Sequence, residues 1–217
     1  SILVGDYLLS RCFEMMVEDG SLEVLKLLST TSAEISQGEV LQLQYKGEID
    51  MLEETYLKII SAKTASLFAA ATKVGSILSN KENKIKDALE FYGKNLGLTF
   101  QIADDTLDYN SELKLFGKEI GNDFYEGKVT LPIILLYQKS NEDEKIKLKE
   151  LFKKKDRSVE EFKSILIMIK KYNIIFECYR KAEHFINLAS NSLSIFNKSK
   201  EKDMLQGLTS FSLERTF

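Results

Sequence analysis

The sequence of 217 residues contains one proline, Pro132, and no long hydrophobic run. Because 44% of its residues are hydrophobic and 29% are charged, the composition is that of a globular protein with a core, which excludes disordered and collagen-like chains. Apolar stretches such as 131–137 and 164–169 are far shorter than the roughly 20 residues that cross a bilayer. We therefore expect a single globular domain, residues 1–217, that does not span a membrane.

Cysteine and histidine are also scarce. Cys12 and Cys178 lie far apart without CxxC spacing, which argues against a disulfide framework or a zinc site and favours a reducing compartment. His184 is the only histidine, so we assign it a structural or surface role. We expect a cytoplasmic protein.

Positive charge is not in excess. The sequence has 30 Lys and Arg residues and 33 Asp and Glu residues, which gives a net charge of −3. No positive field is left to neutralise phosphates along a polymer, so we expect no nucleic-acid partner.

No targeting signal is visible in the first residues of this sequence. The first residues already follow an amphipathic helical pattern, with no basic segment, apolar region and cleavage site. We expect the sequence to be the C-terminal portion of a longer chain.

Helical periodicity dominates what is present. Apolar residues recur at i, i+3, i+4 and i+7 along nearly the whole chain, and strand patterns are almost absent, which predicts an all-α fold. Glycines at 117, 121 and 127 predict one extended loop over 115–130, and such a long loop is uncommon unless it is functional. The predicted helices cover 3–19, 21–43, 48–79, 82–110, 131–139, 142–153, 159–171 and 174–196, with a short helix after Lys200.

An acidic turn, 104–108, is the sharpest local feature. Helix positions four apart lie about 40° apart, so Asp104 and Asp108 share one face, with Gln101 one turn earlier and Asp105 on the flank. Like charges within one turn repel each other unless a cation lies between them, and Mg²⁺ prefers carboxylate, water and phosphate oxygens. The turn therefore indicates a metal-bridged phosphate ligand. A solvated acidic helix end explains the same residues.

Lysines accompany this turn in two other segments. The predicted loop presents Lys118 and Lys128 among its glycines, together with Asp123. Lys63 and Thr64 lie in a helix that is otherwise small and apolar, where a lysine either extends to solvent or pairs with an anion.

Taken in order, these motifs resemble those of the trans-polyprenyl diphosphate synthases, most closely the long-chain branch that makes octaprenyl-type diphosphates. The resemblance covers the whole sequence. The matching segments are 4–9, 38–43, 63–65, 100–109 and 117–132.

The resemblance implies an all-α isoprenoid-synthase-type helical bundle, a homodimer and an Mg²⁺-dependent transferase. In this family Mg²⁺ bridges helix carboxylates to an allylic diphosphate, whose C–O bond ionises to an allylic cation and diphosphate. Isopentenyl diphosphate then attacks the cation and loses a proton, which lengthens the trans chain. The implied product is a long chain of the kind found on quinones.

The same resemblance assigns roles to individual residues. It implies that Asp104, Asp105 and Asp108 bind Mg²⁺ as the second aspartate-rich motif. The implied diphosphate-binding lysines are Lys63, Lys118 and Lys128. Thr64 and Gln101 match polar groups that steady the cation and orient the loss of the proton.

One departure from the family pattern leaves alternatives open. The first aspartate-rich motif and the basic cluster for isopentenyl diphosphate are expected before Val4, outside these 217 residues. A noncatalytic subunit or a truncated, inactive fragment of such an enzyme is therefore an alternative. A terpene cyclase would carry an N-D-x-x-S-x-x-x-E pattern, which is absent, and a purely structural module would leave the acidic turn unexplained.

Overall fold

The computed structural model describes residues 2–110 and 120–214, and within these residues every regular element is a helix. The all-α prediction is confirmed. In chain order the elements are α1 (Ile2–Asp19), α2 (Leu22–Gln44), α3 (Glu53–Ile60), the π-helical turn η1 (Ser61–Ala65), α4 (Ser66–Leu78), α5 (Asn83–Leu107), α6 (Asn122–Glu126), α7 (Leu131–Lys139), α8 (Glu142–Lys153), α9 (Val159–Lys171), α10 (Ile174–Ser192), the 3-10 turn η2 (Leu193–Ile195) and α11 (Lys200–Glu214).

Local capping explains why several helices begin where the sequence predicts. The Ser21 side chain accepts a hydrogen bond from the backbone N–H of Val24 and caps α2. Capping boxes start α8, from Asn141, and α9, from Ser158. Pro132 lies in the first turn of α7, where its missing N–H costs nothing.

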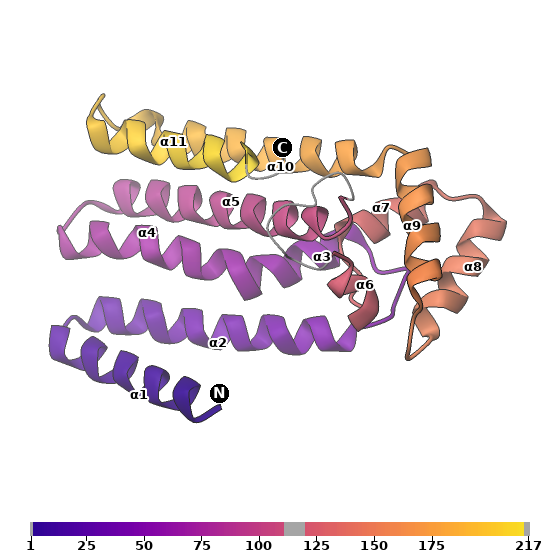
Figure 1. Ribbon diagram of the computed structural model, residues 1–217. Coiled ribbons are helices and arrows are strands. Elements are labelled where there is room, and N and C mark those ends of the chain that lie inside the picture. The colour runs from indigo at the N-terminus through magenta and orange to yellow at the C-terminus, as the bar shows by residue number, and fades with distance from the viewer. Residues whose placement is uncertain (1, 111–119, 215–217) are drawn as a thin grey trace.

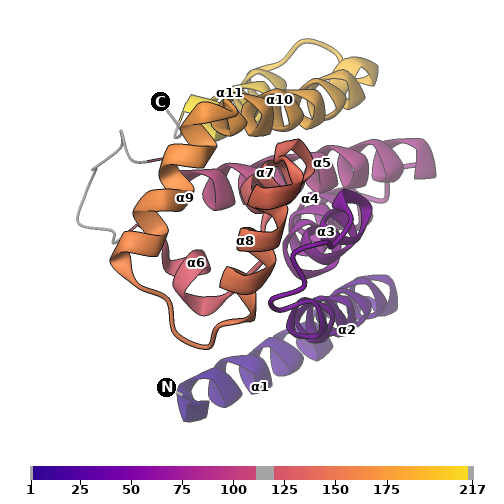
Figure 2. The same cartoon turned by 90° about the vertical axis from the view of Figure 1, so that its right-hand side faces the viewer.

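The long helices lie side by side, and the short ones gather at one end (Figure 1). α5 lies between α4 and α10 and packs most extensively against these two helices. α2 packs on the other side of α4, with α1 beyond it (Figure 2). α6 to α9 lie near the C-terminal ends of α2 and α5. This end of the molecule also contains η1 and therefore most of the predicted site.

The main buried cluster surrounds the C-terminal half of α5. Its helical members come from α3, η1 and α5 to α10, and each large apolar side chain buried there stabilises the fold by about 1.5–3 kcal/mol. Examples are Ile60, Ile102, Leu131, Leu148 and Phe162. In contrast, α1 buries none of its residues. None of the described helices has the length and apolarity that a bilayer crossing requires.

Two predicted segments differ from the structure. The helix expected over 48–79 begins at Glu53 and contains the π-helical turn η1 in its middle. The extended loop expected over 115–130 is wrong for residues 122–126, which form α6, while 115–119 lie outside the described residues. α6 lies between Gly121 and Gly127, both at positive φ, and its N-terminal N–H groups donate to the carboxylate of Asp108, the residue that follows α5.

Candidate active site at the end of α5

Two glycines hold the π-helical turn that carries Lys63 and Thr64. A Cβ atom on Gly38 of α2 would lie 2.6 Å from the backbone nitrogen of Lys63. A Cβ atom on Gly97 of α5 would lie 2.6 Å from the Cα atom of Ala65. Only glycine allows both helices to approach η1 this closely. Lys63 and Thr64 are thereby fixed between α2 and α5, where a π-turn places them in a register that a regular α-helix would not give.

A chain of hydrogen bonds then connects η1 to α5 and α3. Thr64 Oγ1 donates to Gln101 Oε1 at 2.8 Å, and Gln101 Nε2 donates to Asp105 Oδ1 at 2.8 Å. Tyr56 Oη donates to the other carboxylate oxygen, Asp105 Oδ2, at 2.7 Å. The structure therefore brings three of the predicted site residues, Thr64, Gln101 and Asp105, into direct contact.

Asp105 lies in the core and not on the exposed acidic face. Its exposed fraction is 5%, and burial raises the pKa of its carboxyl to about 7. Burial is the largest cause of this rise in pKa; the charges of Asp123 and Asp104 contribute to it, and the hydrogen bonds from Tyr56 and Gln101 oppose it.

Asp108 organises the start of α6. Its Oδ1 atom accepts hydrogen bonds from the backbone N–H groups of Gly121 and Asn122, each at 3.2 Å, and its Oδ2 atom accepts one from Asp123 at 2.8 Å. The carboxylate is 5% exposed and acts as a cap supplied by another helix. α6 is consequently fixed to the end of α5, and Asp123 is held next to the acidic turn.

Lys128 follows α6 and faces two of its acids. The Lys128 Nζ atom lies 2.7 Å from Glu126 Oε2 and 3.3 Å from Asp123 Oδ1. Lys128 lowers the pKa of Glu126, with smaller contributions from the charges of Lys46 and Lys63. Burial raises the pKa of Asp123, the charge of Asp108 adds to this, and Lys128 opposes it. The electrostatic coupling thus extends from the acidic turn to Lys128 and Lys63.

Lys63 lies across α2. Its Nζ atom donates to Gln42 Oε1 at 2.8 Å and forms an ion pair with Glu39 Oε1 at 3.0 Å. The lysine is therefore paired with an anion, which was one of its two sequence-based interpretations. Lys118 lies outside the described residues.

The carboxylates of the acidic turn and of Asp123 are the kind of ligand that Mg²⁺ prefers, although they are not arranged as a ready metal site. Within 2–110 and 120–214, no three or more His, Cys, Asp or Glu side chains form a ready metal-binding group. Asp105 and Asp108 each accept protein hydrogen bonds on both carboxylate oxygens. Burial is the main cause of the raised pKa of Asp105 and Asp123, and Asp104 adds to both. Mg²⁺ commonly binds only one or two carboxylates together with water and phosphate oxygens. A bound Mg²⁺ would also offset the repulsion between these neighbouring carboxylates. The donor set therefore fits the ion.

Sequence reasoning missed several partners of the site. Tyr56 precedes Lys63 by seven residues, two helical turns, so the helical period could have placed it near the same side. Glu39 and Gln42 lie inside the matching segment 38–43 but had no role there. Glu126 carried no signal, because its contact depends on the fold of α6.

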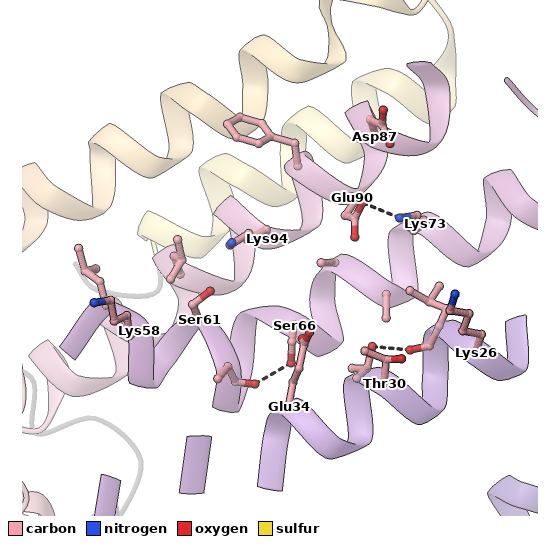
Figure 3. A pocket seen from close by; sticks show the side chains of 18 of the residues that line it. Lys26, Thr30, Glu34, Lys58, Ser61, Ser66, Lys73, Asp87, Glu90 and Lys94 are labelled. Atoms are coloured by element: carbon pink, nitrogen blue, oxygen red, sulfur yellow. Dashed lines mark hydrogen bonds and ion pairs between the residues drawn. The ribbon is translucent and has the colours of Figure 1, made fainter. Parts of the chain in front are cut away.

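The cavity that the structure contains between α2, α4 and α5 is a different feature. It encloses about 1010 Å³ and does not include any of the described site residues in its lining. Both lysines and acidic residues line it. Lys73 of α4 forms an ion pair with Glu90 of α5 there (Figure 3). Ser61 and Ala62 of η1 line this groove, so it borders the turn that carries Lys63 and Thr64.

The comparison with known families identifies the chain. The model of the family described as polyprenyl synthetase matches residues 1–169. The chain belongs to the polyprenyl synthetase family. This membership favours the prenyltransferase interpretation over a terpene cyclase or a structural module.

Curated members of the family are similar over different lengths. An all-trans-nonaprenyl-diphosphate synthase (geranyl-diphosphate specific) of Rhodobacter capsulatus is 34% identical over 215 residues, which cover 99% of this chain and 65% of the relative. The octaprenyl diphosphate synthase of Escherichia coli K12 is 44% identical over 134 residues, which cover 62% of this chain and 42% of the relative. The chain thus spans less than two thirds of the length of these two relatives.

Solved structures show the same helical fold. A decaprenyl diphosphate synthase from Rhodobacter capsulatus superposes with a TM-score of 0.93 at 34% identity, covering 100% of this chain and 66% of the other. A polyprenyl synthase from Caulobacter crescentus CB15, complexed with calcium and isoprenyl diphosphate, gives 0.94 at 35% identity with the same coverage. The isoprenoid-synthase-type bundle predicted from the motifs is confirmed.

Proposed function

We propose that the chain is part of a trans-prenyltransferase that adds isopentenyl diphosphate units to an allylic diphosphate with the help of Mg²⁺. The observation that carries the proposal is the set of contacts at the end of α5. Thr64 contacts Gln101, Asp108 holds Asp123, and Asp123 pairs with Lys128. Thr64 and Gln101 are 37 residues apart in the sequence, and Asp108 and Asp123 are 15 residues apart, yet each pair is in contact in the fold.

The relatives support the proposed substrates and product class. Two curated relatives are named nonaprenyl and octaprenyl diphosphate synthases, and the Caulobacter structure contains calcium and isoprenyl diphosphate. Geranylgeranyl and short-chain isoprenyl diphosphate synthases also match. We choose a long-chain product of the quinone side-chain type because these two relatives are named for nonaprenyl and octaprenyl diphosphates.

The lysines would bind the diphosphate. The present ion-pair partners of Lys63 and Lys128 include Glu39 and Glu126, whose side chains are half exposed. Ion pairs at such exposure are weak, so diphosphate oxygens, which carry more charge, would replace these carboxylates. Lys118 would be the third lysine of this site.

Asp104, Asp105 and Asp108 form the acidic turn of the proposed metal site. Of these, Asp104 would be a direct ligand, together with Asp123, while Asp105 and Asp108 use both carboxylate oxygens for hydrogen bonds within the protein. Bound Mg²⁺ would neutralise the charge of the leaving diphosphate. Thr64 and Gln101 would face the allylic cation with oxygen lone pairs, and the buried cluster behind them would keep water away.

Oligomerisation and localisation complete the proposal. We propose a single prenyltransferase domain over 1–217 that forms a homodimer in the cytoplasm. The apolar side chains of α1, such as Leu3, Tyr7 and Leu8, are exposed and would suit a partner surface, and Cys178 is buried as a free thiol. Light scattering behind a sizing column tests the dimer, which a monomer mass would contradict.

An elongation assay tests the enzymatic part. The natural protein is incubated with Mg²⁺, an allylic diphosphate and labelled isopentenyl diphosphate, and the products are separated by chain length. Lys128→Ala should reduce kcat/KM by roughly 100-fold, because a charge-assisted contact to the diphosphate is lost. Lys163→Ala, an exposed lysine on α9, should leave the rate unchanged.

The outcomes separate activity from binding. No product from the wild-type protein would contradict the proposed transferase and favour the alternative of a noncatalytic subunit or inactive fragment. Equal rates for Lys128→Ala and the wild-type protein would show that this lysine does not bind the diphosphate.

A further inference from the structure

We propose that Tyr56 is a positioning residue that acts through Asp105 and Gln101 to orient the hydroxyl group of Thr64. This inference rests on the proposed function of the site. Tyr56 lies on α3, Thr64 on η1, and Gln101 and Asp105 on α5. Three hydrogen bonds of 2.7–2.8 Å join the four side chains in one line.

The chemistry of the donors gives this line a direction. Both Asp105 oxygens accept hydrogen bonds, Oδ1 from the Nε2–H group of Gln101 and Oδ2 from the O–H group of Tyr56. Gln101 must therefore turn its carbonyl oxygen toward Thr64. Thr64 has a single hydroxyl hydrogen, and it donates that hydrogen to Gln101 Oε1. The remaining lone pairs of Thr64 Oγ1 then point away from Gln101.

Burial makes the orientation firm. Tyr56 is 2% exposed and Asp105 is 5% exposed, so water does not compete for the carboxylate oxygens. Hydrogen bonds in such surroundings are stronger than in water and polarise one another. Because both Asp105 oxygens are engaged, the carboxylate cannot turn to the face of Asp104 without leaving Tyr56 and Gln101 unpaired.

The consequence concerns the charge that develops in the proposed reaction. A hydroxyl oxygen that presents lone pairs stabilises a neighbouring positive charge, whereas one that presents its hydrogen repels it. If the carboxylate is removed, the Gln101 amide loses its acceptor and is free to rotate, and Thr64 can then turn its hydrogen outward. If the Tyr56 hydroxyl is removed, the carboxylate loses one of its two partners and is free to turn, which weakens its hold on Gln101. The Tyr56 hydroxyl thus acts on the cation without touching it.

The test compares two conservative variants of buried tyrosines. Tyr56→Phe removes only the hydroxyl that binds Asp105. Tyr92→Phe is the matched control, because Tyr92 is also buried, at 0% exposure, and donates to the Leu205 carbonyl at 2.7 Å, away from the site. Both variants should lose similar stability. Tyr56→Phe should lower kcat roughly 10-fold with KM for both substrates unchanged, and Tyr92→Phe should lower neither.

A second measurement does not depend on turnover. The side-chain amide signal of Gln101 is followed by ¹⁵N NMR, after assignment by its loss in Gln101→Leu. The signal should shift in Tyr56→Phe and in Asp105→Asn but not in Tyr92→Phe. Asp105→Asn should also leave the Mg²⁺ concentration for half-maximal activity unchanged. Loss of a direct metal ligand would raise this concentration.

The two readouts distinguish the possible failures. The proposed relay is the hydrogen-bonded line from Tyr56 through Asp105 and Gln101 to Thr64. An unshifted Gln101 signal, or equal kcat values for Tyr56→Phe and the wild-type protein, would overturn the proposed relay. A shifted signal in a protein that makes no prenyl product would support the relay and contradict the proposed transferase.

Discussion

The aspartates of the acidic turn differ in role because their partners differ. Asp105 accepts hydrogen bonds from Tyr56 and Gln101 inside the core, and Asp108 binds backbone N–H groups at the start of α6. Asp104 lies one turn before Asp108 and is half-buried. Three identical side chains within five residues therefore lie in three different environments.

The raised pKa of Asp105 predicts a specific pH dependence of stability. Its folded pKa of about 7 lies above the ordinary aspartate value of 3.8, so between these values the folded state binds the proton more tightly than the unfolded state. The free energy of unfolding should therefore fall as pH rises through this window, by up to about 1.4 kcal/mol per pH unit from this group.

Urea unfolding at pH 5.5 and 7.5, without divalent cations, measures this effect. The wild-type protein should lose more stability between the two pH values than Asp105→Asn, which lacks the titrating group. Equal losses in the two proteins would contradict the environment described for Asp105.

Helix-to-helix contacts explain the geometry of the site at the scale of elements. η1 is held between Gly38 of α2 and Gly97 of α5, and α6 is held by Asp108 at the end of α5. Neither η1 nor α6 is stable through its own length, since each has only five residues. Both depend on neighbours that are distant in sequence.

Gly97→Ala tests the first contact. The added methyl group would lie 2.6 Å from Ala65 Cα, which forces η1 away from α5 and should cost about 1–3 kcal/mol of stability. Gly75→Ala is the matched control, because a Cβ atom there meets nothing within 4 Å and alanine favours the helix by up to about 1 kcal/mol. Thermal unfolding should move in opposite directions for the two variants. A Gly97→Ala variant that is more stable than the wild-type protein would contradict the close contact between α5 and η1.

Asp108→Ala tests the second contact. Loss of the carboxylate leaves the N-terminal N–H groups of α6 without their acceptor, which should cost about 2 kcal/mol. Hydrogen exchange of the α6 amides should become much faster, while the amides of α8, capped locally by Asn141, should keep their rates. Unchanged exchange in α6 would show that the cap is not needed.

These dependences also decide what the sequence could predict. The bounds 131–139, 142–153 and 159–171 agree with α7, α8 and α9, because caps such as Asn141 and Ser158 are local signals. α6 was missed because its cap lies more than twelve residues earlier. The π-turn and the Tyr56 contact were also missed, since both arise when α2, α3 and α5 pack together. Periodicity gives residue faces but not which faces meet.

The whole molecule places opposite charges around one end of a helical bundle. The ends of α2 and α5, η1 and α6 converge there (Figure 1), with acids on α5 and α6 and with Lys63 and Lys128 beside them. The fold agrees with known prenyl synthase structures at a TM-score of 0.93. We expect this end of the bundle to bind a diphosphate together with Mg²⁺.

Calorimetric titration of inorganic diphosphate into the protein, with and without Mg²⁺, tests this claim most directly. We expect saturable binding that requires Mg²⁺ and is weakened roughly 10-fold by Lys63→Ala and again by Lys128→Ala, while Lys163→Ala binds like the wild-type protein. Binding that ignores Mg²⁺, or that survives the loss of both lysines, would contradict the account.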